Sequence, residues 1–221
     1  MASDPFALAF EDLPKELIVF PLPGALLLPH GRLPLNIFEP RYLALVEEAL
    51  AFRRLIGMIQ PTGELEPDST RAKLFQVGCA GRIHSFNEIE DGRYLISLVG
   101  VARFRIVEEV EMRRGFRRVR ADWQAYLADL SGGKACLVNR SGLLEQLRCY
   151  FNLQGIASEW EMIEKTDDEK LITSLAMICP FTPCEKQALL EAPDMEERCR
   201  LLTTLMNMAS LEDEECEAVR H

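Results

Sequence analysis

Few side chains in this sequence have the types and spacing that nucleophilic catalysis requires. A cysteine or serine nucleophile needs a base within hydrogen-bond reach, and the chain has three histidines, His30, His84 and His221. Cys79 lies closest in sequence to a histidine, but five positions along an extended strand place Cys79 and His84 on opposite faces. We therefore expect structural roles for these residues, and a thiol hydrolase is the weaker interpretation.

Metal or disulfide chemistry has one candidate pair of thiols. Cys179 and Cys184 flank residues 180–183, where a turn would bring them close together. A structural zinc site needs four ligands, and Cys199 and Cys216 do not have the paired spacing of such sites. The seven cysteines are scattered and odd in number, which is typical of reduced thiols. We expect helix packing, with a metal or redox site as the alternative, and no cofactor.

Phosphate chemistry has no complete motif in the 221 residues. The nearest fragment, Gly132 to Ala135, does not have the second glycine at the required spacing or the hydroxyl that binds Mg²⁺. We expect neither ATP hydrolysis nor peptidase activity from these residues, so the sequence predicts a protein that is not an enzyme.

A cluster of arginines is the one patch suited to binding phosphate groups. Its members are Arg113, Arg114, Arg117, Arg118 and Arg120. One hypothesis is RNA or nucleotide binding through Arg114, Arg117, Arg118 and Arg120. The simpler interpretation is a solvent-exposed sheet face that complements the acidic half of the chain. The net charge of −10 favours the simpler interpretation, so nucleic acid is disfavoured as a partner.

An apolar run is the candidate for binding polypeptides. Leu26, Leu27 and Leu28 lie between a glycine and a proline, and together with Phe38 and Tyr42 they are predicted to form an exposed apolar face. The alternative is that the three leucines belong to the core, because periodicity cannot resolve a continuous apolar run.

The elements that position these residues fall into a β-rich part and a helical part. Period-two runs separated by turn residues predict strands at residues 17–20, 55–59, 75–86, 94–99, 104–110 and 116–123. Asp91 and Gly92 predict a type I′ hairpin turn. Pro40 predicts the first turn of one helix that covers one mouth or face of the sheet, since Tyr42, Val46 and Ala49 follow at helical spacing.

After Trp123 the periodicity becomes helical. A linker at residues 131–133 precedes a helix predicted at about 134–151. Three capping-box patterns predict further helix starts, at Thr166 with Glu169, Thr182 with Glu185, and Asp194 with Glu197.

The charge distribution also divides the chain. Residues 122–221 hold 9 basic and 19 acidic side chains, against 16 and 16 in residues 1–121. We therefore predict two domains, a β domain at 14–123 and an acidic helical bundle at 133–210. The N-terminus has no secretory signal pattern and no apolar run is long enough for a membrane span, so we expect a soluble cytoplasmic protein with no membrane partner.

Three ordered segments together resemble the Lon N-terminal domain, the substrate-binding region of the Lon protease. They are residues 17–42, residues 77–106 with VGCAGRIHSF and DGRYLISLVGVARFRI, and residues 174–206, within a resemblance that spans about residues 14–209. The resemblance implies an α+β protein with a PUA-like β pseudobarrel, one crossing helix and a following α-helical bundle. It also implies a stand-alone, non-catalytic protein- or peptide-binding module that lacks the ATPase and Ser-Lys peptidase parts. The implied partners are unfolded or misfolded polypeptides, or a protease or chaperone served by an adaptor in protein quality control.

Overall fold

A computed structural model describes residues 9–65, 71–131 and 139–218, with side chains described up to residue 209. The predicted linker residues Gly132 and Gly133 and the predicted helix start at Lys134 lie outside the described residues. In chain order the elements are η1 (Phe10–Asp12), β1 (Glu16–Pro21), β2 (Arg32–Ile37), α1 (Pro40–Ala51), β3 (Leu55–Ile59), β4 (Pro61–Leu65), β5 (Ala72–Leu74), β6 (Val77–Glu88), β7 (Tyr94–Arg113), β8 (Phe116–Asp122), η2 (Gln124–Leu130), α2 (Arg140–Leu153), α3 (Trp160–Lys165), α4 (Asp168–Ile178), α5 (Pro183–Glu191) and α6 (Met195–Ala218).

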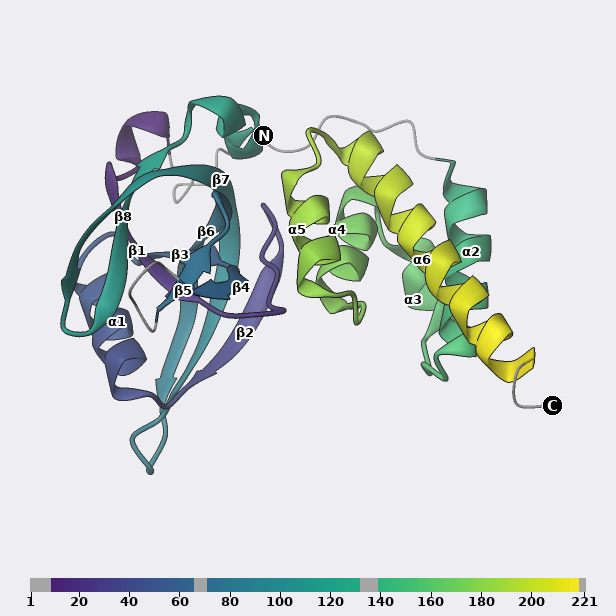
Figure 1. The fold of residues 1–221 in the computed structure, drawn as a ribbon, viewed down its shortest axis with the longest axis horizontal. Coiled ribbons are helices and arrows are strands. Elements are labelled where there is room, and N and C mark those ends of the chain that lie inside the picture. The colour runs from purple at the N-terminus through teal and green to yellow at the C-terminus, as the bar shows by residue number, and fades with distance from the viewer. Residues whose placement is uncertain (1–8, 66–70, 132–138, 219–221) are drawn as a thin grey trace.

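The main sheet closes into a hydrogen-bonded ring. Its strand order is β2-β7-β6-β3-β1-β8, and β8 also pairs with β7. The first part of β7 pairs with β2 and β6, and its last part pairs with β8. Strands β2 and β8 therefore pair with successive parts of β7. The β1–β3 pairing is parallel, whereas β7 is antiparallel to each of its partners. Figure 1 shows this ring on one side of the molecule and the helices α2–α6 on the other. The predicted α+β class, with a β pseudobarrel followed by helices, is confirmed.

Strand β7 corrects the sequence prediction of two separate strands at 94–99 and 104–110. The chain runs through Gly100 without a turn, as one strand of 20 residues. A Cβ atom at Gly100 would lie 1.9 Å from the carbonyl oxygen of Leu28. Glycine is therefore required here because the backbone of the β1–β2 segment crosses directly over the strand.

The β6–β7 hairpin differs from the predicted type I′ turn. Gly92 has a φ of +79°, whereas Asp91 is not among the residues with positive φ. The amide of Gly92 donates to the carbonyl of Ile89 at 2.9 Å, and the amide of Ile89 donates to the carbonyl of Arg93 at 3.0 Å. The loop therefore has three central residues, with Gly92 in the left-handed conformation. It reverses the chain with one residue more than the predicted two-residue turn.

The helix starts of the second part follow local capping rules, with one correction. Thr182 and Glu185 form the predicted capping box: the Thr182 hydroxyl accepts from the Glu185 amide at 3.3 Å. The predicted box at Thr166 is wrong, because Thr166 donates its hydroxyl to the carbonyl of Met162 at 2.7 Å. Asp167 caps α4 instead and accepts from the amide of Lys170 at 3.0 Å. Thr166 and Asp167 are both favourable N-cap residues, so the sequence alone does not determine which of the two begins the helix.

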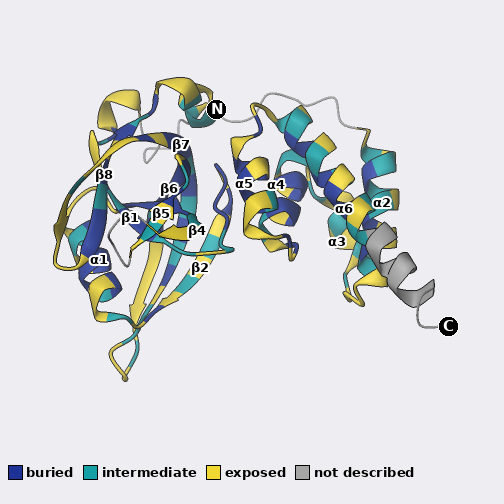
Figure 2. Cartoon of the chain, in the orientation of Figure 1, coloured by how far each residue is buried: buried dark blue, intermediate teal, exposed yellow. Residues whose placement is uncertain are grey.

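The largest core cluster joins the ring to the helices. It contains Leu26, Leu27 and Leu28 from the β part and Ile172, Leu175 and Leu189 from the helical part. A second cluster lies inside the ring around Phe104 and Trp123, whose ring centroids are 5.6 Å apart. Figure 2 shows buried residues along the strands of the ring and in α4, and α5 also contributes buried residues such as Leu189 and Leu190. No helix among the described residues is long and apolar enough to cross a membrane.

Candidate functional site

The predicted apolar face is not formed by the three leucines. Leu26, Leu27 and Leu28 are each at most 1% exposed. Their segment is held down by two backbone bonds to Gly100: the amide of His30 donates to the Gly100 carbonyl at 2.9 Å, and the amide of Gly100 donates to the Gly31 carbonyl at 2.9 Å. The expectation of an exposed leucine face is therefore corrected in favour of its alternative, because the run lies between the ring and the helices.

The two aromatic residues predicted for that face have different environments. Tyr42 is buried, its ring lies 4.1 Å from that of Phe20 between centroids, and burial raises the pKa of its phenol. Phe38 is 63% exposed at the junction between β2 and α1. Of the five predicted residues, only Phe38 could touch another molecule without a rearrangement of the fold.

Further exposed apolar side chains lie at the same end of the sheet as Phe38. Phe86 and Leu95 are 40% and 41% exposed, and the ring of Phe86 lies 5.0 Å from that of Tyr94. Register places Phe86 opposite Ile96 and places Leu95 opposite Asn36, so Phe86 and Leu95 are on opposite faces of the strands. Figure 1 shows this end of β6 and β7 projecting beyond the ring.

The arginine cluster is neutralised by carboxylates of the β part. Arg114 pairs with Glu47 at 2.6 Å, Arg117 with Glu109, Arg118 with Glu16, and Arg120 with Glu108; the neighbouring Arg113 pairs with Glu48 at 2.7 Å. Arg117 is also buried and donates to the carbonyl of Ala72 at 2.6 Å. These carboxylates, not the acidic helical half, complement the cluster, which corrects the sequence interpretation. None of the four arginines predicted for RNA is left with an uncompensated charge.

The candidate thiols are poorly placed for chemistry. Cys79 is buried, and burial raises its pKa far above that of a free thiol, while His84 is exposed on the same strand. Burial likewise raises the pKa of Cys179 to about 11. Cys179 and Cys184 are not joined in a disulfide. Within the described ranges, no group of three or more histidine, cysteine or acidic side chains could hold a metal ion.

A polar network fixes α5 against the β part. The side-chain amide of Gln60 donates to the Pro183 carbonyl at 3.0 Å and to the Gln187 side chain at 3.3 Å, and Gln187 donates to the Val77 carbonyl at 3.0 Å. Lys186 donates its ammonium to the Gly24 carbonyl at 2.8 Å, and burial lowers its pKa. Hydrogen-bonded polar groups of this kind set one orientation for the two parts.

Arg103 forms a second connection between the two parts, which we call the Arg103 clamp. Its guanidinium donates to both oxygens of Asp129 at 2.9 Å and to the carbonyls of Leu190 and Ala192 at 3.1 and 2.6 Å. The guanidinium also lies 4.7 Å from the ring centroid of Tyr126. A cation at the C-terminus of α5 is favourable because the last carbonyls of a helix carry partial negative charge. The Arg103 clamp thus joins β7, η2 and α5.

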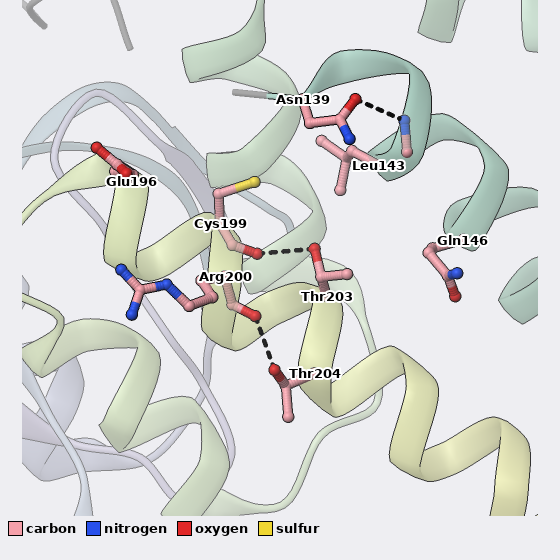
Figure 3. Close-up of a pocket in the computed structure, with 9 residues that line it drawn as sticks. Asn139, Leu143, Gln146, Glu196, Cys199, Arg200, Thr203 and Thr204 are labelled. Atoms are coloured by element: carbon pink, nitrogen blue, oxygen red, sulfur yellow. Dashed lines mark hydrogen bonds between the residues drawn. The ribbon is translucent and has the colours of Figure 1, made fainter. Parts of the chain in front are cut away.

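A groove of about 420 Å³ lies between α2 and α6 (Figure 3). Its floor includes Leu143 and Cys199, which are 2% and 8% exposed. Its walls carry amide, hydroxyl and charged groups from both helices: Asn139, Gln146, Glu196, Arg200, Thr203 and Thr204. The remaining lining residue is Gly142, where a Cβ atom would lie 2.9 Å from the side-chain nitrogen of Asn139, the residue that caps α2. We call this feature the α2–α6 groove.

Comparison with known protein families shows which family this chain belongs to. A family model described as the ATP-dependent protease La (LON) substrate-binding domain matches residues 16–208. The chain belongs to this family. Among curated proteins, Lon protease 2 of Myxococcus xanthus is 27% identical over 210 residues and Lon protease of Anaeromyxobacter dehalogenans is 26% identical over 200 residues. Each alignment covers 89% of this chain but 24% of the relative, so the chain spans about a quarter of the length of these Lon proteases.

Solved structures of the Lon N-terminal domain have the same fold. A Lon N-terminal domain protein from Xanthomonas campestris superposes with a TM-score of 0.58 at 22% identity, over 86% of this chain and 97% of that one. The N-terminal domain of Lon protease from the Mycobacterium avium complex gives a TM-score of 0.60 at 18% identity, over 87% and 98% of the two chains. Almost the whole length of each Lon domain is therefore matched by the ring and the helices together.

The region that matches the Lon family model contains surface features that the sequence did not indicate as functional. The α2–α6 groove, Phe86 and Leu95 all lie within residues 16–208. No motif marks the groove, because its two walls come from distant parts of the chain.

Proposed function

We propose that this chain is a non-catalytic module that binds unfolded or misfolded polypeptides. The observation that carries the proposal is the match of residues 16–208 to the substrate-binding domain of the La protease. This match includes both the β ring and the helices, so it concerns the whole described architecture. The burial of Cys79 and Cys179, with pKa values raised by that burial, is consistent with a role in binding and not in catalysis.

Binding of this kind suits an adaptor that presents clients to a protease or a chaperone. The module needs an accessible apolar contact for such clients, because unfolded chains expose apolar side chains that folded proteins bury. Phe38 is the one residue of the predicted face that meets this requirement, at 63% exposure. We therefore propose Phe38 as a client contact on the β part.

Binding of an unfolded model protein tests the proposal. Fluorescently labelled, reduced and carboxymethylated α-lactalbumin is titrated with the protein in the absence of nucleotide, and the disulfide-intact native form serves as the folded control. We expect a micromolar affinity for the unfolded form and none for the native form. Absence of binding to the unfolded form at about 100 μM protein, a ceiling that corresponds to roughly −5.5 kcal/mol, would overturn the proposed function.

A matched pair of variants tests Phe38. Phe38→Ser and Phe52→Ser each remove an exposed phenylalanine, since the two residues are 63% and 64% exposed. We expect weaker binding for Phe38→Ser alone. Equal affinities for the two variants would show that Phe38 is not a client contact, while the proposed function itself would stand.

A further inference from the structure

The α2–α6 groove has the form of a binding site for a chain segment. Its volume of about 420 Å³ falls in the range of ligand pockets. The buried floor at Leu143 and Cys199 is apolar, whereas Gln146, Thr203 and Thr204 place amide and hydroxyl groups along the walls. The Thr203 hydroxyl donates to the Cys199 carbonyl at 2.9 Å and the Thr204 hydroxyl to the Arg200 carbonyl at 3.0 Å. The oxygens of both hydroxyls can still accept a hydrogen bond from a ligand.

The charge of the residues around the groove determines which ligand charge the groove favours. Residues 139–209 contain 12 acidic and 7 basic side chains. All seven basic side chains are engaged within the chain. Five form ion pairs with carboxylates, namely Arg140, Arg148, Lys165, Lys170 and Arg200. The other two, Lys186 and Arg198, are buried and donate to backbone carbonyls. The surface charge that remains to attract a ligand is therefore negative.

The groove itself follows this pattern. Glu196 lines it with an exposed carboxylate, and the positive charge of Arg200 is paired with Glu197 at 2.8 Å. A cationic ligand is therefore favoured beside Glu196, and an anionic one is repelled.

We propose that the α2–α6 groove binds a basic polypeptide segment in which an apolar side chain is flanked by lysine or arginine. The apolar side chain packs on Leu143 and Cys199, and a flanking cation lies near Glu196. The inference rests on the proposed function for the ligand being a polypeptide. It adds a second contact surface, distinct from Phe38, and a preference among clients by charge.

Two labelled peptides of equal length test the charge preference. One has a central leucine and phenylalanine flanked by lysines, and the other has glutamate at every lysine position. By fluorescence anisotropy at low salt, we expect the lysine peptide to bind about tenfold more tightly, and we expect the difference to shrink in 0.5 M salt as screening increases. Equal or tighter binding of the glutamate peptide contradicts the charge argument.

Variants on α2 test the position of the site. Gln146→Trp fills the groove from its α2 wall, whereas Asn152→Trp adds the same side chain at an exposed position of α2 that does not line the groove. We expect the lysine peptide to bind Gln146→Trp about tenfold more weakly and to bind Asn152→Trp as it binds the original protein. Thr204→Trp fills the groove from α6 and should act like Gln146→Trp, so the test does not depend on one variant remaining folded.

The outcomes separate this inference from the proposed function. If the lysine peptide binds and neither groove variant weakens it, the groove assignment is wrong while polypeptide binding stands. If neither the peptides nor the unfolded model protein bind, the proposed function fails and the groove assignment fails with it. Glu196→Lys should weaken the lysine peptide about two- to tenfold, a range set by the modest strength of exposed ion pairs.

Discussion

Removal of the Arg103 clamp should cost more stability than removal of any surface arginine. In Arg103→Met the Asp129 carboxylate, whose side chain is 9% exposed, is left buried without its cation, and the carbonyls of Leu190 and Ala192 lose their donor. Loss of one partner of a buried ion pair costs about 3–5 kcal/mol. With a loss of about 4 kcal/mol and an m-value of about 2.5 kcal/mol/M, the urea midpoint should fall by about 1.6 M.

A matched control makes this measurement specific. Arg120→Met removes a guanidinium whose partner is Glu108, in a pair with side chains 52% and 51% exposed. Exposed pairs contribute less than about 1 kcal/mol, so this variant should shift the midpoint by less than about 0.4 M. The double variant Arg103→Met with Asp129→Leu should regain part of the loss, because it removes the unpaired buried charge.

Circular dichroism during urea titration provides the assay for all three variants. The reasoning is refuted if Arg103→Met and Arg120→Met shift the midpoint equally, or if the double variant is less stable than Arg103→Met alone. A lower m-value in Arg103→Met would indicate that the two parts no longer unfold together.

Four further predictions follow from burial and backbone geometry. Leu27→Asp should lower the free energy of unfolding by more than about 4 kcal/mol and yield insoluble protein, because it buries a carboxylate at a position that is 1% exposed. A soluble variant with an unchanged urea midpoint would contradict the assignment of Leu27 to the core. Alkylation mapped by mass spectrometry should label the exposed thiols Cys149 and Cys184 before that of Cys179, and equal rates would count against the described burial. Because burial raises the pKa of Cys179 to about 11 from a model-peptide value near 9, its contribution to stability should be complete below about pH 9 and decline as the pH rises towards 11; Cys179→Ala should show a smaller decline in urea midpoint over that window. Gly100→Ala should cost about 3 kcal/mol, since the added Cβ meets the Leu28 carbonyl at 1.9 Å, and an unchanged urea midpoint would exclude this close approach.

Local signals in the sequence predicted local structure well. The capping box of Thr182 and Glu185 and the proline at the start of α1 each depend on a few neighbouring residues, and both are present in the structure. Strand β2 was not predicted, because Pro34 interrupts a pattern that otherwise reads as a strand. Pro34, which has no amide N–H to donate, is tolerated because β2 lies at an edge of the sheet order and pairs with β7 alone.

The candidate site depended on contacts that the sequence does not encode locally. Leu26 to Leu28 could be read as surface or core, and only the docking of the helices on the ring decides between the two. The arginines of β8 looked available because their carboxylate partners come from elsewhere in the chain, as with Glu16 on β1 for Arg118. The α2–α6 groove was not foreseen for the same reason, since α3, α4 and α5 lie between its two walls in the chain.

The closure of the ring by β8 also has a consequence for synthesis on the ribosome. Strand β1 pairs with β8, and the β7–β8 pairing completes the ring, so the last strand must emerge before the earlier edges are covered. About 95 residues separate the end of β1 at Pro21 from the start of β8 at Phe116. At about 5–20 residues per second, one edge of β1 stays open for roughly 5–20 s. During that time the nascent chain is itself an unfolded polypeptide with an exposed strand edge, which makes it a potential client for chaperones.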